Sequence, residues 1–228
     1  MVTALRGNRR GAEGKIRSMC SVVSLGDVDT YRTPALSSTD ALWLKDEGFT
    51  VAQTLVVLQR TGRVSTPSVP TVVCRNETSR HLLSPKREEL LRALLAIDAA
   101  SFPAPWNLDA PAFRHACRAT GEHRVVIAND DDNATSPIGY AIVGRVGVRS
   151  YLQRLAVAPH ARRRGVAQAL VHNASLWADS RGATTMLVNT EPTNAAALAL
   201  YRSLGFDMLP DSFVVMECAV NVAPEVSA

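Results

Sequence analysis

Three consecutive arginines and a glycine stand where a strand-like segment gives way to a helical one. The run Arg162-Arg163-Arg164-Gly165-Val166-Ala167 follows the apolar stretch from Tyr151 to Val157 and opens a segment with helical periodicity. Unpaired N–H groups at the start of a helix bind anions such as a pyrophosphate. Cations at that end oppose the helix dipole unless an anion lies nearby, although a solvated run of charge is the alternative interpretation. We therefore expect a phosphate-binding turn here.

The small residues of this turn fit the same chemistry. Gly165 can adopt left-handed backbone angles and lets the chain approach a ligand, and Ala167 keeps a long side chain away from the phosphates. The sequence contains neither GxxxxGK[ST] nor GxGxxG, so it matches neither a P-loop nucleotidase nor a dinucleotide-binding fold.

Periodicity predicts the elements that must position this turn. Ser84 and Pro85 are typical of a helix start, and leucines with Asp98 follow at helical spacing. Three β-branched and aromatic runs before the turn indicate an antiparallel meander. Helices are expected at 85–100, 109–120, 166–182 and 194–204, and strands at 124–129, 138–145, 151–157, 184–190 and 213–220.

These motifs resemble the GNAT acyltransferase family, whose signature is [RQ]xxGx[GA] after a strand that ends in Ala-Val or a similar pair. Here that strand ends in Leu155-Ala156-Val157, and the family's Asn, Tyr and Gly-Phe ending corresponds to Asn194, Tyr201 and Gly205-Phe206. The resemblance, which includes bacterial ribosomal-protein-alanine and N-terminal acetyltransferases, covers about residues 82–220. It implies an α/β (α+β) GNAT fold: a mixed, mostly antiparallel twisted sheet with splayed central parallel strands, flanked by helices.

The resemblance also implies a site for acetyl-CoA between the splayed strands 151–157 and 184–190. The pantetheine chain would pair with the backbone of Leu155 and Val157, and the pyrophosphate would lie on the amides that open the following helix. The residues expected to contact the cofactor are Leu155, Ala156, Val157, Arg162, Arg163, Arg164, Gly165, Val166, Ala167, Gln168, Asn194 and Tyr201.

Acyl transfer to an amine needs a proton for the departing thiolate. A phenol with a pKa of ~10 can supply it to a thiolate whose thiol has a pKa of roughly 8 to 9. The resemblance assigns this role to Tyr201, with a core tyrosine on an Ala/Leu helix as the alternative. Related N-terminal acetyltransferases commonly carry a glutamate at the position of Asn189, and an amide cannot accept a proton in its place. Glu191, on the same strand face, is the predicted substitute; a water chain, or an amine bound neutral, would need no dedicated base.

The predicted function is therefore transfer of an acetyl group from acetyl-CoA to an amine acceptor by direct attack in a ternary complex. The acceptor is a peptide N-terminus, a lysine or a small-molecule amine. The segment Phe102-Pro103-Ala104-Pro105-Trp106 is either an aromatic wall beside the acceptor or a cap on the core. The alternative function is a catalytically degenerate module that binds acyl-CoA in a regulatory or structural role.

Composition limits the remaining functions. The chain has 228 residues with 46% hydrophobic and 20% charged, which excludes a wholly disordered or fibrous protein. Its net charge of +4 is too small to indicate nucleic acid, and no apolar run approaches the ~20 residues of a membrane span. The cysteines at 20, 74, 117 and 218 form no CxxC pair and the histidines show no ligand spacing, so we expect reduced thiols, a cytoplasmic location and no metal.

Punctuation by Pro, Ser and Thr predicts a domain boundary near residue 82. The expected parts are a disordered basic tail at 1–18 with translation starting at Met19, an N-terminal segment at 19–81, the acetyltransferase domain at 82–220 and a tail at 221–228. A helix, Gly-Phe and apolar strand at 42–58 repeat the pattern at 200–216, so 19–81 is either a degenerate partial copy of the same fold or a chance likeness. The strand Leu55–Leu58 could pair across a homodimer or close the sheet's own edge.

Overall fold

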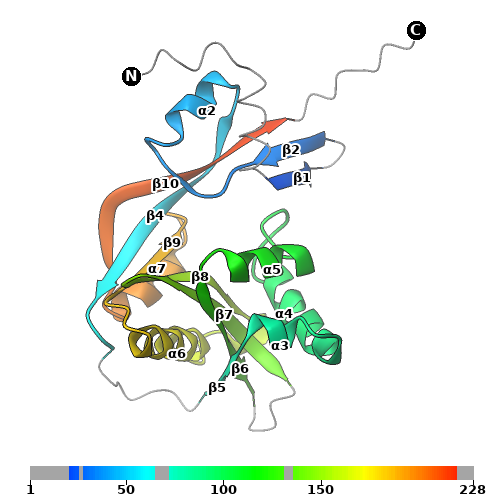
Figure 1. Cartoon of the computed structure of the whole chain (residues 1–228), viewed down its shortest axis with the longest axis vertical. Coiled ribbons are helices and arrows are strands. Elements are labelled where there is room, and N and C mark those ends of the chain that lie inside the picture. Colours follow the sequence, from blue (N-terminus) through cyan, green and yellow to red (C-terminus); the bar gives the residue numbers. More distant parts are fainter. Residues whose placement is uncertain (1–20, 26–27, 65–71, 131–135, 220–228) are drawn as a thin grey trace. The chain divides into compact units, whose positions relative to one another are not determined.

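The computed structural model divides into two units by its internal contacts (Figure 1). It describes residues 21–25, 28–64, 72–130 and 136–219. The larger unit comprises residues 57–190 and 194–209, and the smaller unit comprises the described residues up to 56, 191–193 and those from 210 onward. Two long strands, β4 (Thr50–Thr61) and β10 (Asp207–Ala219), contribute residues to both units.

The larger unit is built on a mixed sheet. Its strands besides the end of β4 are β5 (Val73–Glu77), β6 (Glu122–Asn129), β7 (Pro137–Val146), β8 (Arg149–Val157) and β9 (Thr185–Thr190). The order is β4-β9-β8-β7-β6-β5; β5 through β8 are antiparallel to one another, and β8 and β9 form a parallel pair. The structure thus confirms the predicted mixed, mostly antiparallel sheet and its three-stranded meander.

Helices cover both faces of this sheet. They are α3 (Ser79–Leu82), α4 (Glu88–Ala99), α5 (Ala110–Arg118), α6 (Val166–Ser180) and α7 (Ala195–Ser203). The expected start at Pro85 is a single 3₁₀ turn, Pro85–Arg87, and the α-helix begins one turn later at Glu88. Asp109 starts α5 by accepting a hydrogen bond from Ala112 N–H at 2.7 Å, as its place before Pro111 predicts.

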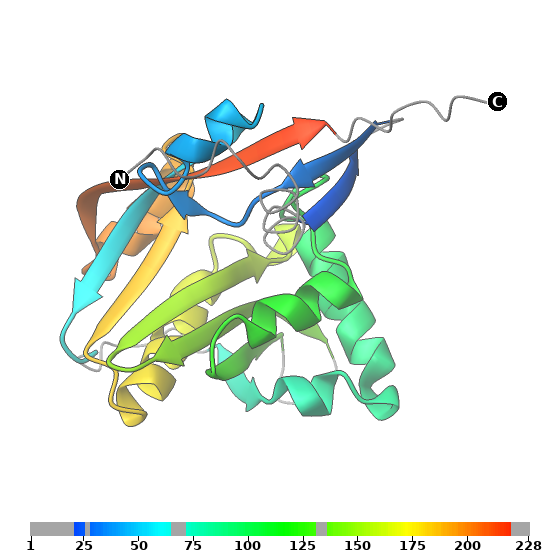
Figure 2. The same ribbon diagram turned by 45° about the horizontal axis from the view of Figure 1, so that its top comes forward.

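Alternation along β7 separates the two helical layers. A side chain at Gly139 would come within 3.1 Å of Val166 and Leu170 on α6. The next residue, Tyr140, points to the other face, where its ring centroid lies 5.7 Å from that of Phe113 on α5. Figure 2 shows the green helices α4 and α5 on the opposite side of these strands from the yellow helix α6.

The smaller unit has its own apolar cluster, and among the described residues its strands are part of the same 10-stranded sheet. Its elements are β1 (Ser21–Leu25), β2 (Val28–Arg32), β3 (Leu36–Ser37) and α2 (Leu42–Asp46), together with the first part of β4 and most of β10. β1 pairs with β2, and β10 pairs with both β2 and β3, all antiparallel. Leu44, Phe49 and Met216 form the buried centre of the cluster.

The residues around the expected boundary at 82 belong to the larger unit. β5 precedes that boundary and pairs with β6 along its whole length, and α3 follows directly. Residues 57–61 of β4 also belong to the larger unit, where β4 neighbours β9. Of the two expected uses of Leu55–Leu58, the structure shows pairing within the chain's own sheet; a homodimer stays a prediction.

The tails expected at 1–18 and 221–228 and the expected translation start at Met19 lie outside the described residues. Within the described ranges, no helix is long and apolar enough to cross a membrane.

Candidate active site

The parallel strands β8 and β9 stop pairing midway. Their register joins Arg149–Tyr151 to Thr185–Leu187, although β8 continues to Val157 and β9 to Thr190. Beyond Tyr151, the backbone of β8 therefore has no β9 partner on that side. This is the splayed pair that the sequence predicts, and it leaves a strand edge open for a ligand.

The hydrogen-bonding alternation of β8 shows which groups face the opening. Ala158 N–H donates to Ile138 O at 2.9 Å, so residues in step with Ala158 direct their backbone toward β7. Leu155 and Val157 alternate with Ala156 and Ala158, so their backbone N–H and C=O groups point away from β7, as predicted for residues that contact the cofactor. Ala156 lies opposite Tyr140 and pairs with β7, so its backbone is not available to a ligand in the opening.

A β-bulge marks the point where β8 leaves β9. Ile142 lies opposite Arg154 and Val143 opposite Leu152, so Gln153 is the extra residue. The Oε1 atom of Gln153 is buried and has no hydrogen-bond partner among the described residues. The spacing of the sequence gave no indication of this bulge, because nothing in the residue types of β8 distinguishes an extra residue from a regular one.

The turn between β8 and α6 presents a row of free amides. Arg163 and Gly165 both have left-handed backbone angles, with φ of 62° and 77°. The first helical hydrogen bond of α6 runs from Ala169 N–H to Gly165 O at 3.0 Å, so the three preceding helical N–H groups have no acceptor within the helix. No backbone acceptor is found in the described part of the chain for the N–H groups of 163–165 either.

This geometry is that of an anion-binding nest. Alternating right- and left-handed residues turn successive N–H groups to one side, and the start of a 15-residue helix adds its dipole. The left-handed angle of Arg163 is costly for a residue with a Cβ, of order 1 kcal/mol, and such strain concentrates at functional sites.

The three arginine side chains differ in their partners. Arg162 donates to two carbonyl oxygens, Val157 O and Ala100 O, at 3.3 and 3.2 Å. Arg164 forms an exposed ion pair with Asp130 at 2.6 Å. Two of the three guanidiniums thus bind groups of the protein itself, and the backbone of the turn rather than the arginine side chains is its main anion-binding feature.

Tyr201 lies on α7 within the larger unit. It is 5% exposed, its ring centroid is 5.7 Å from that of Phe206, and its hydroxyl has no hydrogen-bond partner in the described part of the chain. Burial raises the pKa of Tyr201 well above its ordinary value, so the phenol keeps its proton at neutral pH. Asn194 caps the same helix by accepting from Ala197 N–H at 3.1 Å, which gives its side-chain oxygen a structural partner.

Glu191 is an exposed residue of the smaller unit, where it accepts a hydrogen bond from Gln53 Nε2 on β4. Asn189, also exposed, lies on β9, which ends at Thr190. Glu191 therefore follows the strand, and the expectation that it shares a strand face with Asn189 is wrong. The role of Glu191 as a base stays a prediction. Among the described residues, no group of three or more His, Cys, Asp or Glu side chains is placed to hold a metal ion.

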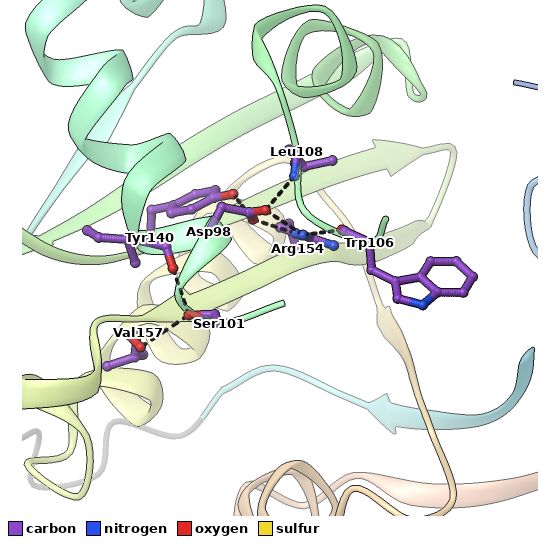
Figure 3. Close-up of polar contacts among 8 residues, drawn as sticks. Asp98, Ser101, Trp106, Leu108, Tyr140, Arg154 and Val157 are labelled. Atoms are coloured by element: carbon purple, nitrogen blue, oxygen red, sulfur yellow. Dashed lines mark hydrogen bonds and ion pairs between the residues drawn. The ribbon is translucent and has the colours of Figure 1, made fainter. Parts of the chain in front are cut away.

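One polar cluster was missed by the sequence analysis. Asp98, which is fully buried on α4, accepts hydrogen bonds from Arg154 on β8, Tyr140 on β7 and the backbone of Leu108 (Figure 3). The sequence did give one signal, because Asp98 falls on the same helix face as leucines of α4. An aspartate is fully buried almost only when it is paired with another group in the core. The sequence does not reveal the partner, because Arg154 is 56 residues away along the chain.

The mixed sheet with its splayed parallel pair, the helices on both faces and the amide turn are the features that the sequence resemblance predicts. The family model of the acetyltransferase (GNAT) family matches residues 91–206, which is half of the chain, and the chain belongs to this family. It is a member of a family of N-acetyltransferases, as the sequence predicts.

Individual relatives are more distant. Over 57 residues the chain is 40% identical to aminoglycoside N(6')-acetyltransferase type 1 of Klebsiella aerogenes, a stretch that covers 25% of this chain and only 38% of that protein. A GNAT-family protein from Novosphingobium aromaticivorans superposes with a TM-score of 0.59 at 18% identity, over 92% of this chain and 80% of its own. A GCN5-related N-acetyltransferase from Sphaerobacter thermophilus gives 0.55 at 16% identity, over 83% and 59%. These two structures show the fold alone.

Proposed function

We propose that this protein transfers an acetyl group from acetyl-CoA to an amine by direct attack within a ternary complex. The observation that carries the proposal is the continuity of two open backbone edges. The part of β8 that has no β9 partner leads, after one short turn, into the free amides that open α6. An extended chain ending in a pyrophosphate matches both edges in turn.

The residues present fit acetyl-CoA. The backbone of Leu155 and Val157 faces the opening, and the amides from Arg163 to Gln168 have no backbone acceptor in the described structure. These groups would hold the pantetheine and the pyrophosphate. When bound, acetyl-CoA supplies an acetyl group activated as a thioester. The Val157 carbonyl already accepts from Arg162 Nε at 3.3 Å, so only its N–H is offered without competition.

Tyr201 would act as the proton donor. Burial keeps the phenol protonated, and its hydroxyl has no competing acceptor in the described residues. It can therefore hold a proton until a thiolate departs and then donate it. Because the raised pKa makes this phenol a weaker acid than an ordinary tyrosine, transfer to a thiolate whose thiol has a pKa of roughly 8 to 9 is uphill in free energy.

Glu191 would accept the proton of an ammonium acceptor. It is exposed and ionisable, and the Gln53 amide orients its carboxylate. Because Asn189 occupies the place of a glutamate in related N-terminal acetyltransferases, a catalytically degenerate acyl-CoA-binding module is the second candidate function. The two candidates predict the same cofactor affinity and differ in turnover.

The cofactor site is tested by calorimetric titration of the full chain with acetyl-CoA and with CoA. We expect micromolar binding of both to the wild type and a loss of at least 100-fold in Gly165→Glu, which places a side chain and a negative charge in the amide turn. Gly147→Glu is the matched control, because Gly147 also has a left-handed φ, of 60°, and lies in the turn between β7 and β8. A folded wild type that binds neither ligand would overturn the proposal.

The acceptor is tested with a panel of amines. The short match to an aminoglycoside acetyltransferase supports kanamycin as one probe, and a peptide with a free N-terminal alanine and Nα-acetyl-lysine represent the other predicted acceptors. Release of CoA is followed by chromatography, with and without each amine. Acceptor-dependent release supports the enzyme; tight cofactor binding without release for any amine supports the degenerate module.

A further inference from the structure

The loop between α4 and α5 is tied to β8 by one buried ion pair. The carboxylate of Asp98 receives Arg154 Nε on one oxygen and Arg154 Nη2 on the other, at 2.7 and 2.6 Å. The same Nη2 donates to Trp106 O at 2.8 Å, and Leu108 N–H donates to Asp98 Oδ1 at 2.6 Å. Both partners of the pair therefore end on the backbone of the loop (Figure 3).

Two further contacts hold the start of the loop. The guanidinium carbon of Arg154 lies 3.4 Å from the ring centroid of Phe102, a stacked cation–π arrangement. Ser101 Oγ lies 3.3 Å from Val157 O, at the end of the open part of β8, although its single proton has a closer acceptor in Ile97 O at 2.8 Å. Residues 101–108 are thus fixed to the segment of β8 that has no β9 partner.

Stability alone does not account for this arrangement. A buried ion pair is weak evidence for stabilisation, because apolar residues of similar volume often serve as well or better. A planar guanidinium gives what apolar residues cannot, since it bonds a carboxylate, a carbonyl and an aromatic face in fixed directions. Tyr140 donates to Asp98 Oδ2 from the core side at 2.5 Å, which fixes the carboxylate itself.

We propose that Asp98 and Arg154 are positioning residues that set the place of loop 101–108 beside the open edge of β8. This inference rests on the proposed function, in which the edge holds the cofactor, and on the first of the two predicted roles of 102–106, a wall beside the acceptor rather than a cap on the core. Figure 3 shows the Trp106 indole directed away from the ion pair while its carbonyl is held by Arg154. The pair therefore determines where Trp106 stands without touching either substrate.

The test uses Trp106 as a reporter of loop position. Trp43→Phe with Trp177→Phe leaves Trp106 as the single tryptophan of the chain. In that background we compare Asp98→Asn, Arg154→Lys and Tyr140→Phe for acrylamide quenching of Trp106, for acetyl-CoA affinity by calorimetry, and for KM and kcat with the best amine of the panel. Glu88→Gln is the matched control, because it removes a carboxylate from α4 that pairs only with the exposed Arg92.

We expect Arg154→Lys and Asp98→Asn to at least double the quenching constant and to raise the acceptor KM at least tenfold, with acetyl-CoA affinity changed less than threefold. Tyr140→Phe, whose hydroxyl does not reach the loop, should change KM less than threefold. If the ion pair has only a structural role, the loss of activity in each variant should follow its loss of stability. The apparent kcat would then fall because less of the protein is folded.

Unchanged quenching and KM in Arg154→Lys, with the wild type binding acetyl-CoA, would overturn the positioning role alone. Failure of the wild type to bind acetyl-CoA would overturn the proposed function, while the quenching data would still show whether the ion pair holds the loop. If Asp98→Asn does not fold, Arg154→Lys decides the question, because it keeps the positive charge and loses only the directed bonds.

Discussion

The turn that precedes α2 and the first turn of α7 have the same hydrogen-bond pattern although they belong to different units. α2 itself begins at Leu42, after Ala41, which makes no side-chain cap. Ser37 Oγ accepts from Asp40 N–H, and Asn194 Oδ1 accepts from Ala197 N–H, both at 3.1 Å. The backbone carbonyls of the same two residues, Ser37 and Asn194, each accept the fourth following N–H at 3.0 Å. The starts of the two segments are therefore equivalent position by position.

The ends of the two segments match at the same spacing. Phe49 N–H donates to Leu44 O and Phe206 N–H donates to Tyr201 O, each at 3.0 Å, across a left-handed glycine. Both phenylalanines are buried, and both lead into a long strand. This agreement supports the predicted partial copy of the fold in the N-terminal part of the chain.

The two segments differ in the residue whose carbonyl accepts the hydrogen bond from the phenylalanine N–H. Leu44 is fully buried in one, and Tyr201 is 5% exposed in the other. Because an aliphatic side chain satisfies the packing at this place, the hydroxyl of Tyr201 is not needed to build the helix end. The comparison thus assigns the capping pattern to folding, and the hydroxyl is left for the proposed role in proton donation.

The largest expected effect separates these two assignments. Tyr201→Phe keeps the ring on Phe206 and removes only the proton donor, so kcat should fall by about 10² to 10⁴, the usual worth of a general acid. Acetyl-CoA affinity should stay within threefold. Steady-state kinetics with the best amine and calorimetry measure the two quantities, and Tyr31→Phe in the smaller unit is the matched control. An unchanged kcat would make Tyr201 the packing equivalent of Leu44.

Truncation of the two phenylalanines tests the equivalence of the ends. Phe49→Ala and Phe206→Ala should each lower the free energy of unfolding of their own unit by about 3 to 5 kcal/mol, because both rings are buried. Urea unfolding followed by hydrogen exchange measures each unit separately. Phe206→Ala should also lower kcat, because the Phe206 ring packs against Tyr201. A comparable loss of kcat in folded Phe49→Ala would contradict the assignment of catalysis to the larger unit.

The local features of these segments could be predicted from the sequence. Gly-Phe after a helical run, the Arg-rich turn before α6 and the meander strands all carry their information in neighbouring residue types. Local patterns therefore located the turn and the helix ends. The splay and the role of Tyr201 were predicted from the family resemblance instead.

Long-range pairing could not be predicted in the same way. The partners of Asp98 lie 42 and 56 residues away on two different strands, and no local pattern selects Tyr140 or Arg154 for it. The bulge at Gln153 and the place of β4 beside β9 also depend on register between distant segments. The sequence likeness at 42–58 indicated a strand there, but not that β4 would run for 12 residues.

A smaller effect is expected at the two glycines of the caps. Gly48 and Gly205 have φ of 87° and 77°, and a Cβ at either would meet no atom closer than 3.9 Å. Gly48→Ala and Gly205→Ala should therefore cost about 1 to 2 kcal/mol each, from backbone strain alone. Urea midpoints measure the loss, with Gly121→Ala as a control at an open position without a left-handed φ. A cost at only one of the two glycines would show that the caps are not equivalent.

The smallest expected effect appears at alkaline pH. Burial raises the pKa of Tyr201 above its ordinary value of 10.0, whereas Leu44 has no proton to lose. Below pH 10 the folded and unfolded chains both hold the phenolic proton, so the free energy of unfolding does not depend on the ionisation of Tyr201. Above pH 10 the unfolded chain loses the proton first, so stability falls by up to about 1.4 kcal/mol per pH unit until the folded phenol ionises.

Tyr201→Phe removes the part of the pH dependence of stability that comes from Tyr201. Burial also raises the pKa of Tyr140, but that residue contributes equally to the pH dependence of both proteins. Urea midpoints of the wild type and Tyr201→Phe should therefore run parallel from pH 8 to 10, and above pH 10 the wild-type midpoint should fall more steeply. Leu44→Met should follow the wild type throughout, because the corresponding place in the smaller unit does not titrate. Parallel curves for wild type and Tyr201→Phe up to pH 11 would mean that the phenol reaches solvent in the folded chain, and a proton donor of ordinary pKa would then replace the buried one in the proposed chemistry.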